Sequence, residues 1–170
     1  MEMIKTIDPR VMIRQASGED AAAVLGYMRK LGAYQKMSEA ITATEPEIKR
    51  LLDENLGAAI FGYYDAQIVS FAFYHRKASA FSGRSGLYID AFLVDAEIRH
   101  IGLGKILMGY LCRLALDQGD QFLEWGCLDW NTPAIEFYKN LGAYSVDDMT
   151  IYRFRPEHLQ AGALLFEPAR

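Results

Sequence analysis

The feature that most constrains this chain is a glycine-containing segment between an apolar strand and an amphipathic helix. Residues 87–94 form a nearly continuous apolar run, which is typical of a strand buried on both faces. Residues 104–118 place apolar side chains at helical spacing, and Gly119 follows as a stop signal. The connecting residues 95–103 are therefore expected to lead from a central strand directly into a helix. Such a unit indicates an α/β fold.

The glycines of this segment point to a bound ligand. Gly102 and Gly104 let the backbone approach a ligand closely, and the start of a helix presents N–H groups that have no intrahelical partner. Together with the helix dipole, these N–H groups make an anion site suited to a pyrophosphate, to which Arg99 can add positive charge. A plain tight turn without a ligand is the alternative interpretation.

Three phosphate-binding patterns can be compared with this segment. A Walker loop lacks its first glycine here, and Ile106 stands where that loop needs Ser or Thr. A dinucleotide fingerprint needs a third glycine where the chain has Leu107. The pattern Arg/Gln-x-x-Gly-x-Gly/Ala is met in full by Arg99, Gly102 and Gly104.

The rest of the chain alternates strand and helix patterns, with no repeat, low-complexity stretch or linker. Strands are predicted at residues 11–15, 58–64, 68–76, 87–94, 122–127 and 149–155. Capping boxes predict helix starts at Ser17–Asp20 and Thr44–Glu47, and Thr132 is the predicted N-cap of a later helix. The order β-α-α-β-β-β-α-β-α-β indicates one mixed α/β domain over residues 1–170, with a core of about residues 11–159 and a short C-terminal tail.

Length and composition narrow the function classes. A chain of 170 residues, 51% hydrophobic and 24% charged, is globular and long enough for a sizeable core. Its net charge of -4 argues against nucleic-acid binding. No apolar run approaches a membrane span, the N-terminus lacks a secretory pattern, and Cys112 and Cys127 are too few for a disulfide framework or a zinc site. We therefore expect a cytoplasmic protein with no metal, nucleic-acid or membrane partner.

Two stretches of the sequence resemble the GNAT N-acetyltransferase superfamily. The arginine–glycine motif of residues 99–104 looks like its acetyl-CoA loop. Residues 130–143 resemble its second signature, Asn-x-x-Ala-x-x-Phe-Tyr-x-x-x-Gly-Phe/Ala. Within the superfamily, residues 88–143 and 31–45 are similar to the diamine (spermidine/spermine) N-acetyltransferases, and the whole resemblance covers about residues 13–159.

The resemblance has consequences for fold, cosubstrate and assembly. It implies a single-domain GNAT fold, with a mixed, mostly antiparallel sheet flanked by helices and splayed central strands that form the acetyl-CoA cleft. It also implies acetyl-CoA as cosubstrate, a small-molecule amine as acceptor and a homodimer.

Roles in acetyl-CoA binding follow from the resemblance, position by position. The implied residues are Phe92, Leu93, Val94, Arg99, His100, Ile101, Gly102, Leu103, Gly104, Lys105, Asn131, Thr132, Pro133, Ala134 and Tyr138. Residues 92–94 would pair through their backbone with the pantetheine arm, and the amides of residues 101–105 would hold the pyrophosphate. Asn131 either bonds the pantetheine or caps its helix. His100, which replaces a usual glycine, either reaches a phosphate or is a solvated loop residue.

Acetyl transfer to an amine needs two further groups. One must hold the ammonium and take its proton, and the other must protonate the departing thiolate. The resemblance puts Asp90 and Tyr138 in these roles. Because a carboxylate in an apolar strand is costly unless it serves or is paired, Asp90 is alternatively a structural residue bonded to Tyr88 or Arg84. Tyr138 is alternatively a core aromatic residue with a satisfied hydroxyl.

The acceptor side departs from the polyamine enzymes. Tyr34, expected to stack on the amine chain, and Gln35 are the further implied substrate residues. Gln35 and Ala91 stand where polyamine enzymes carry carboxylates, which weakens the polyamine interpretation and leaves a diamine, a polyamine or a lysine-like amino acid as acceptor. Direct transfer in a ternary complex needs no nucleophile, so Cys127 is interpreted as a packing residue and His75 as a strand-face residue.

Two other functions are compatible with these residues. One is acetylation of a protein N-terminus or lysine. The other is a non-catalytic CoA-binding regulatory domain, against which the retention of both Asp90 and Tyr138 argues.

Overall fold

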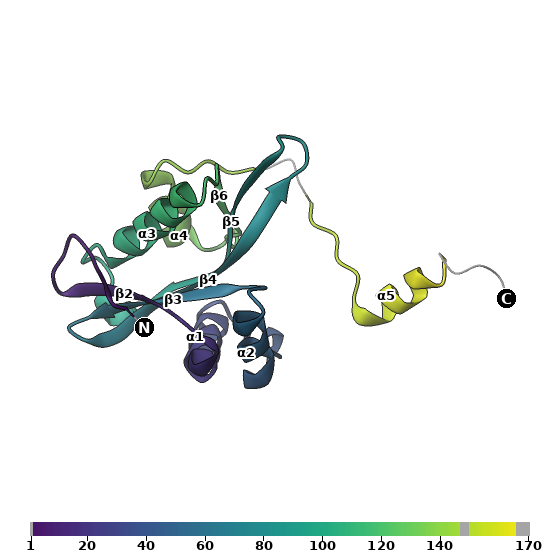
Figure 1. Ribbon diagram of the computed structural model, residues 1–170, viewed down its shortest axis with the longest axis horizontal. Helices are drawn as coiled ribbons and strands as arrows, with labels where there is room; N and C mark the ends of the chain where they lie inside the picture. Colours follow the sequence, from purple (N-terminus) through teal and green to yellow (C-terminus); the bar gives the residue numbers. More distant parts are fainter. Residues whose placement is uncertain (1, 147–149, 166–170) are drawn as a thin grey trace. The chain divides into compact units, whose positions relative to one another are not determined.

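The computed structural model describes residues 2–146 and 150–165 (Figure 1). These form two compact units, with the boundary between Leu128 and Asp129. The N-terminal unit has strands β1 (Ile4–Lys5), β2 (Val11–Gln15), β3 (Ala58–Tyr64), β4 (Gln67–Ser79), β5 (Arg84–Val94) and β6 (Leu123–Trp125). Its helices are α1 (Ala21–Tyr34), α2 (Glu45–Asp53) and α3 (Leu103–Asp117), with short 3-10 turns at Gly18–Asp20, Ser38–Ala40 and Ala96–Ile98. The C-terminal unit has helices α4 (Thr132–Asn140) and α5 (Pro156–Ala163).

Within the described residues, one sheet of six strands runs in chain order from β1 to β6. Neighbouring strands are antiparallel as far as β5. Short connections join β1 to β2, β3 to β4 and β4 to β5, whereas α1 and α2 lie between β2 and β3. The last pair, β5 and β6, is parallel, and α3 supplies the crossover that a parallel pair requires. The predicted mixed, mostly antiparallel sheet is therefore confirmed.

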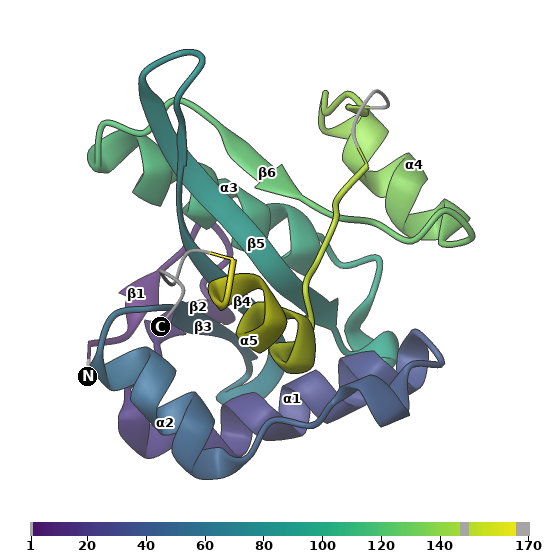
Figure 2. The same cartoon turned by 90° about the vertical axis from the view of Figure 1, so that its right-hand side faces the viewer.

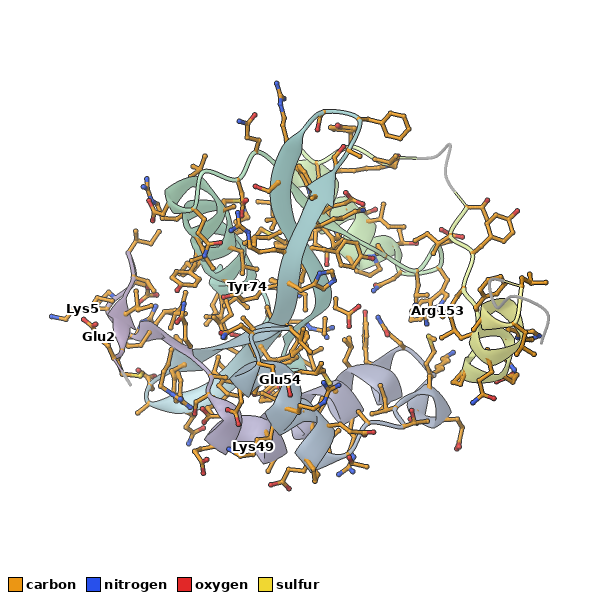
Figure 3. The ribbon with its side chains drawn as sticks, turned by 45° about the vertical axis from the view of Figure 1, so that its right-hand side comes forward. Glu2, Lys5, Lys49, Glu54, Tyr74 and Arg153 are labelled. Carbon is orange, nitrogen blue, oxygen red and sulfur yellow. The ribbon has the colours of Figure 1, made fainter. Side chains whose placement is uncertain are left out.

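Helices cover both faces of the sheet in the N-terminal unit (Figure 1). On one face, α1 and α2 bury Val24 and Ile48 against a cluster that includes Phe61 and Phe71. On the other face, the first residue of α3, Leu103, packs with Val11 and Val69. Tyr74 of β4, labelled in Figure 3, is buried and alternates with Phe73, so its side chain points toward the α3 face.

Both predicted capping boxes are present. The carboxylate of Asp20 accepts a hydrogen bond from the Ser17 N–H at 2.8 Å, before the 3-10 turn that leads into α1. The carboxylate of Glu47 accepts one from the Thr44 N–H at 2.8 Å, at the start of α2. These bonds satisfy N–H groups that the helices cannot satisfy themselves.

The β4–β5 hairpin is longer than predicted and projects beyond the other strands (Figure 2). The predicted strands stopped at residue 76 and resumed at residue 87, but the pairs Ser79–Arg84 and Lys77–Gly86 continue the ladder between those positions. Gly86 signals a turn in isolation, yet here it lies in the strand, where the Phe122 ring packs against it and leaves no room for a Cβ.

The last predicted strand is not formed. Residues 150–155 lie outside any strand, and Met149 falls outside the described residues. An alternating pattern specifies a strand only when a neighbour supplies the hydrogen-bond ladder. Instead, Pro156 begins α5, where the sequence pattern gave no helix.

Candidate active site

The turn between β5 and α3 has the backbone geometry of an anion site. Gly102 is the N-cap of α3, with φ of 90° in the left-handed region that favours glycine. The first helical bond joins the Ile106 N–H to the Gly102 carbonyl at 3.1 Å, so the N–H groups of residues 103–105 have no intrahelical acceptor. An added Cβ at Gly102 would meet no protein atom within 4 Å, which leaves open space beside these amides. The turn therefore fits the pyrophosphate for which it was predicted.

His100 has a backbone conformation that explains the glycine usual at its position. Its φ is 72°, which costs an L-residue free energy relative to glycine. Its side chain is exposed, as expected for a solvated loop residue, and contact with a phosphate stays a prediction.

Arg99 ties the turn to the end of β5. Its Nε donates a hydrogen bond to the Val94 carbonyl at 3.2 Å, and its guanidinium carbon lies 5.0 Å from the centre of the Tyr34 ring. This cation–π contact joins the end of α1 to the turn. Tyr34 was expected to stack on the acceptor amine, but in this structure the guanidinium of Arg99 lies over its ring. Neighbouring Gln35 is the C-cap of α1.

Asp95 is a residue of this region whose role the sequence did not reveal. It directly follows β5, and its carboxylate accepts hydrogen bonds from the Tyr27 hydroxyl at 3.1 Å and from Lys30 Nζ at 3.0 Å. Burial and the nearby Asp95 carboxylate both raise the pKa of Tyr27, which keeps its hydroxyl a donor. These two α1 residues fix the point at which the turn begins.

Asp90 lies at a β-bulge rather than in a buried position. Phe73 pairs with Ala91 and Tyr74 pairs with Ile89, so Asp90 has no partner on β4. The β5–β6 ladder also ends here, with the pair Ile89–Trp125. The Asp90 side chain is exposed, although residues 87–94 were expected to form a strand buried on both faces. The described residues give it no hydrogen bond or ion pair, so the bond to Tyr88 or Arg84 is not formed.

Strands β4, β5 and β6 carry a polar cluster next to the Asp90 bulge that the sequence did not predict. The rings of His75 and Tyr88, a cross-strand pair, are 5.3 Å apart. Lys77 Nζ lies 2.5 Å from a Glu124 carboxylate oxygen and 5.4 Å from the centre of the Tyr88 ring. No local motif signals such a cluster, because it depends on the register of three strands.

A buried carboxylate holds the hairpin beside β6. Asp120 is 3% exposed, and one of its oxygens accepts hydrogen bonds from Ser85 Oγ at 2.5 Å and from an Arg76 guanidinium nitrogen at 2.7 Å. Burial opposes ionisation of Asp120, but the bonds from Ser85 and Arg76 outweigh it and lower its pKa. The adjacent Gln121 N–H donates to the Ser85 carbonyl at 2.8 Å. Together these bonds fix the loop that precedes β6.

The start of α4 differs by one residue from the prediction. Asn131, not Thr132, is the N-cap, and its carbonyl accepts hydrogen bonds from the Ala134 and Ile135 N–H groups at 3.0 Å each. Thr132 is instead the first residue of the helix. Pro133 lies in the first turn, as its fixed φ favours.

Tyr138 lies within α4 and is half-buried. Its ring meets that of Phe137 edge-on, with centres 5.3 Å apart. The cosubstrate and thiolate roles inferred for this C-terminal unit stay predictions.

Residues 2–146 and 150–165 contain neither a cluster of metal ligands nor a helix that could span a membrane. No three His, Cys, Asp or Glu side chains there are grouped as metal ligands. None of the helices in those ranges is both long and apolar enough to cross a membrane.

Comparison with known proteins gives consistent matches. The sequence model of the acetyltransferase (GNAT) family matches residues 22–143. A thialysine N-epsilon-acetyltransferase of Bos taurus is 28% identical over 88% of this chain and 95% of the relative. An L-ornithine N5-acetyltransferase of Arabidopsis thaliana is 26% identical over 69% of this chain and 48% of the relative. The crystal structure of an aminoglycoside N-acetyltransferase in complex with CoA has a similar fold, with a TM-score of 0.68 and 17% identity over 85% of this chain and 95% of that one.

Proposed function

Because this chain belongs to the GNAT acetyltransferase family and is an N-acetyltransferase, we propose that it transfers the acetyl group of acetyl-CoA to a primary amine of a small molecule. One observation carries the proposal. A single strand, β5, holds an exposed carboxylate at Asp90 and leads, through Val94, into the anion-binding turn at Gly102. An amine-binding group and a phosphate-binding group thus belong to one rigid element.

The turn holds the cosubstrate in this proposal. The amides of residues 101–105 bind the pyrophosphate, and the backbone of residues 92–94 pairs with the pantetheine arm. The end of the β5–β6 ladder at Ile89–Trp125 supports this pairing, because those residues lie past the last pair. Bound acetyl-CoA supplies the acetyl thioester.

Asp90 handles the amine. Its exposed carboxylate attracts the acceptor ammonium and accepts a proton from it, directly or through water. The neutral nitrogen then forms a bond to the thioester carbonyl carbon, and the bond from that carbon to sulfur breaks. The proton of Asp90 is released to solvent, which readies the carboxylate for the next acceptor.

Tyr138 handles the leaving group. Its hydroxyl donates a proton to the departing thiolate and regains one from the acetylated nitrogen through solvent. The match of α4 to the second family signature supports this role.

The acceptor is a small amine that carries a second polar group. Two relatives are named for amino acids with a side-chain amine, thialysine and ornithine. This supports a lysine-like amino acid, with a diamine or polyamine as the other candidates. We also propose a cytoplasmic homodimer, which the molar mass in solution and the protein's location in cells would test.

Thiol release from acetyl-CoA over a panel of amines tests this function. Lysine, ornithine, 1,5-diaminopentane, spermidine and a peptide with a free N-terminus are compared with a sample that lacks amine. Release that depends on one of the four small amines is expected. Release only with the peptide would instead make the protein an N-terminal acetyltransferase, and release with none would leave a CoA-binding domain without transfer.

A further inference from the structure

A charged pair spans three strands of the sheet close to the Asp90 bulge. Lys77 comes from β4 and Glu124 from β6, and their side chains meet above the intervening β5 at 2.5 Å. The ring of Tyr88 lies beneath the Lys77 ammonium at 5.4 Å, and His75 packs beside that ring. The side chains of Lys77 and Glu124 are 39% and 36% exposed, so water and small solutes reach both charges.

The pair retains capacity for a ligand. An ammonium has three donors and a carboxylate has about four acceptor sites. The bond between Lys77 Nζ and one Glu124 oxygen uses one of each. An exposed ion pair of this kind contributes little to stability, so its charges are available for recognition at small cost to the fold.

The pair also lies at a suitable distance from Asp90. Tyr88 and Asp90 are two residues or about 6.6 Å apart along β5, and the next strand is about 4.8 Å away. Glu124 is the β6 partner of Tyr88. The backbones of Asp90 and Glu124 are therefore about 8 Å apart. An extended lysine-like chain separates its terminal nitrogen from its α-carbon by about 6 Å, and its α-substituents reach further.

We propose that Lys77 and Glu124 select an amino acid as the acceptor. Lys77 binds its α-carboxylate, Glu124 binds its α-ammonium, and the terminal amine at the other end of the chain reaches Asp90. The methylene chain lies along the rings of Tyr88 and His75. This assignment rests on the proposed function and narrows its substrate class.

The charge pattern distinguishes an amino acid from a diamine of equal length. An amino acid offers one charge of each sign and so satisfies both members of the pair. A diamine offers only a second ammonium, which Glu124 attracts and Lys77 repels. The structure therefore favours lysine over 1,5-diaminopentane, which differs from it only by the loss of the carboxylate.

Steady-state kinetics with these two acceptors test the assignment. Lys77→Met removes the positive charge and keeps most of the apolar stem, and Arg113→Met on α3 is the matched control, because its partner Asp117 lies on the same exposed helix. For the wild type, kcat/KM is expected to be higher with lysine. Lys77→Met is expected to lower kcat/KM for lysine by about 10-fold to 100-fold, the range for hydrogen bonds to charged groups. It should leave the value for the diamine unchanged or higher.

Glu124→Gln gives the complementary result. It removes the negative charge that binds a second ammonium, so it should lower kcat/KM for both acceptors, whereas Arg113→Met should change neither. Because the two variants give different patterns, a general loss of folding cannot imitate both.

The possible outcomes separate this inference from the function on which it rests. One outcome is that the wild type acetylates lysine while Lys77→Met lowers kcat/KM equally for lysine and for the diamine. In that case the pair is structural and the inference is wrong, but the proposed function stands. A wild type that prefers the diamine overturns the inference in the same way. A wild type that acetylates neither compound nor any other small amine overturns the proposed function itself.

Discussion

The behaviour of Asp90 follows from one extra residue in a strand. The bulge between the pairs Tyr74–Ile89 and Phe73–Ala91 removes Asp90 from the ladder with β4. Its carboxylate is exposed, and within the described residues no cation neutralises it. A charge in this position attracts an ammonium without the desolvation cost that burial would bring. We therefore expect Asp90 to contribute to function rather than to stability.

Replacing Asp90 by Asn separates these two contributions. Asp90→Asn keeps the shape but removes the charge and the proton acceptor, so KM for the amine should rise and kcat should fall. The pH dependence of kcat should move upward, toward the pKa of the amine. The free energy of unfolding should change by less than about 0.5 kcal/mol, as for most exposed positions. Steady-state kinetics measure KM and kcat, and urea unfolding measures the free energy of unfolding.

Asp65→Asn is the control for this change, because Asp65 is exposed in the turn between β3 and β4. Asp65→Asn should alter neither the kinetic constants nor the free energy of unfolding. A destabilised Asp90→Asn protein with normal kinetics would show that Asp90 is a structural residue.

The hydroxyl of Tyr138 is the second group whose removal is informative. Tyr138→Phe keeps the ring that packs on Phe137, so folding and CoA affinity should survive. Loss of proton donation to the thiolate should lower kcat by about 100-fold or more. Tyr144→Phe, at an 87% exposed position of the same unit, should leave kcat unchanged. Equal kcat for wild type and Tyr138→Phe, with chemistry limiting the rate, would exclude this role.

At the scale of elements, the β5–α3 turn depends on one backbone conformation. Gly102 has φ of 90° and faces open space, so a side chain there would strain the turn and fill the space expected for phosphate. Gly102→Val should therefore weaken CoA binding by at least about tenfold, which is 1.4 kcal/mol. Titration calorimetry with CoA measures this. Gly109→Ala, inside α3 with open space around it, is the control and should leave the affinity for CoA unchanged. Unchanged CoA affinity in a folded Gly102→Val protein would mean that the CoA site lies elsewhere.

The Asp120 cluster makes the hairpin sensitive to acid. The pKa of Asp120 is lowered from its ordinary value of 3.8 in the folded protein. Above pH 3.8 the ionised carboxylate of Asp120 therefore stabilises the fold, and this contribution is lost as pH falls through the lowered pKa. Asp120→Asn should cost about 1–3 kcal/mol at pH 7, because Ser85 and Arg76 lose a charged acceptor.

Urea unfolding at pH 7 and pH 3 measures this dependence. The difference in the free energy of unfolding between wild type and Asp120→Asn should be smaller at pH 3 than at pH 7. Asp117→Asn, which removes an exposed i,i+4 partner of Arg113, should cost less than about 0.5 kcal/mol at either pH. A gap that stayed constant with pH would mean that Asp120 acts by shape alone.

The elements differ in how far the sequence determines them. The strands Val11–Gln15 and Ala58–Tyr64 were predicted to the residue, since local alternation and turn residues bound them. The Asp90 bulge and the Lys77–Glu124 pair were not, because both arise from the register of strands that are distant in sequence. The glycine motif is a local signal that predicts a phosphate site, whereas the link from Asp95 to α1 is visible only in the packed structure.

At the scale of the whole molecule, the account requires both substrates to be bound together. Asp90 and the turn at Gly102 belong to one strand–turn–helix unit, so in the proposed mechanism the same element binds the amine and the thioester. No residue of the proposed mechanism forms a bond to the acetyl group. The enzyme is therefore expected to transfer acetyl directly from sulfur to nitrogen.

The pattern of initial velocities tests this central claim most directly. Acetyl-CoA and the best acceptor of the amine panel are varied together, and the intact mass of the protein is measured after incubation with acetyl-CoA alone. Direct transfer predicts double-reciprocal lines that intersect and a protein mass that does not change. Parallel lines together with an acetylated protein that passes its acetyl group to the amine would contradict the account, because they require a covalent intermediate on the enzyme.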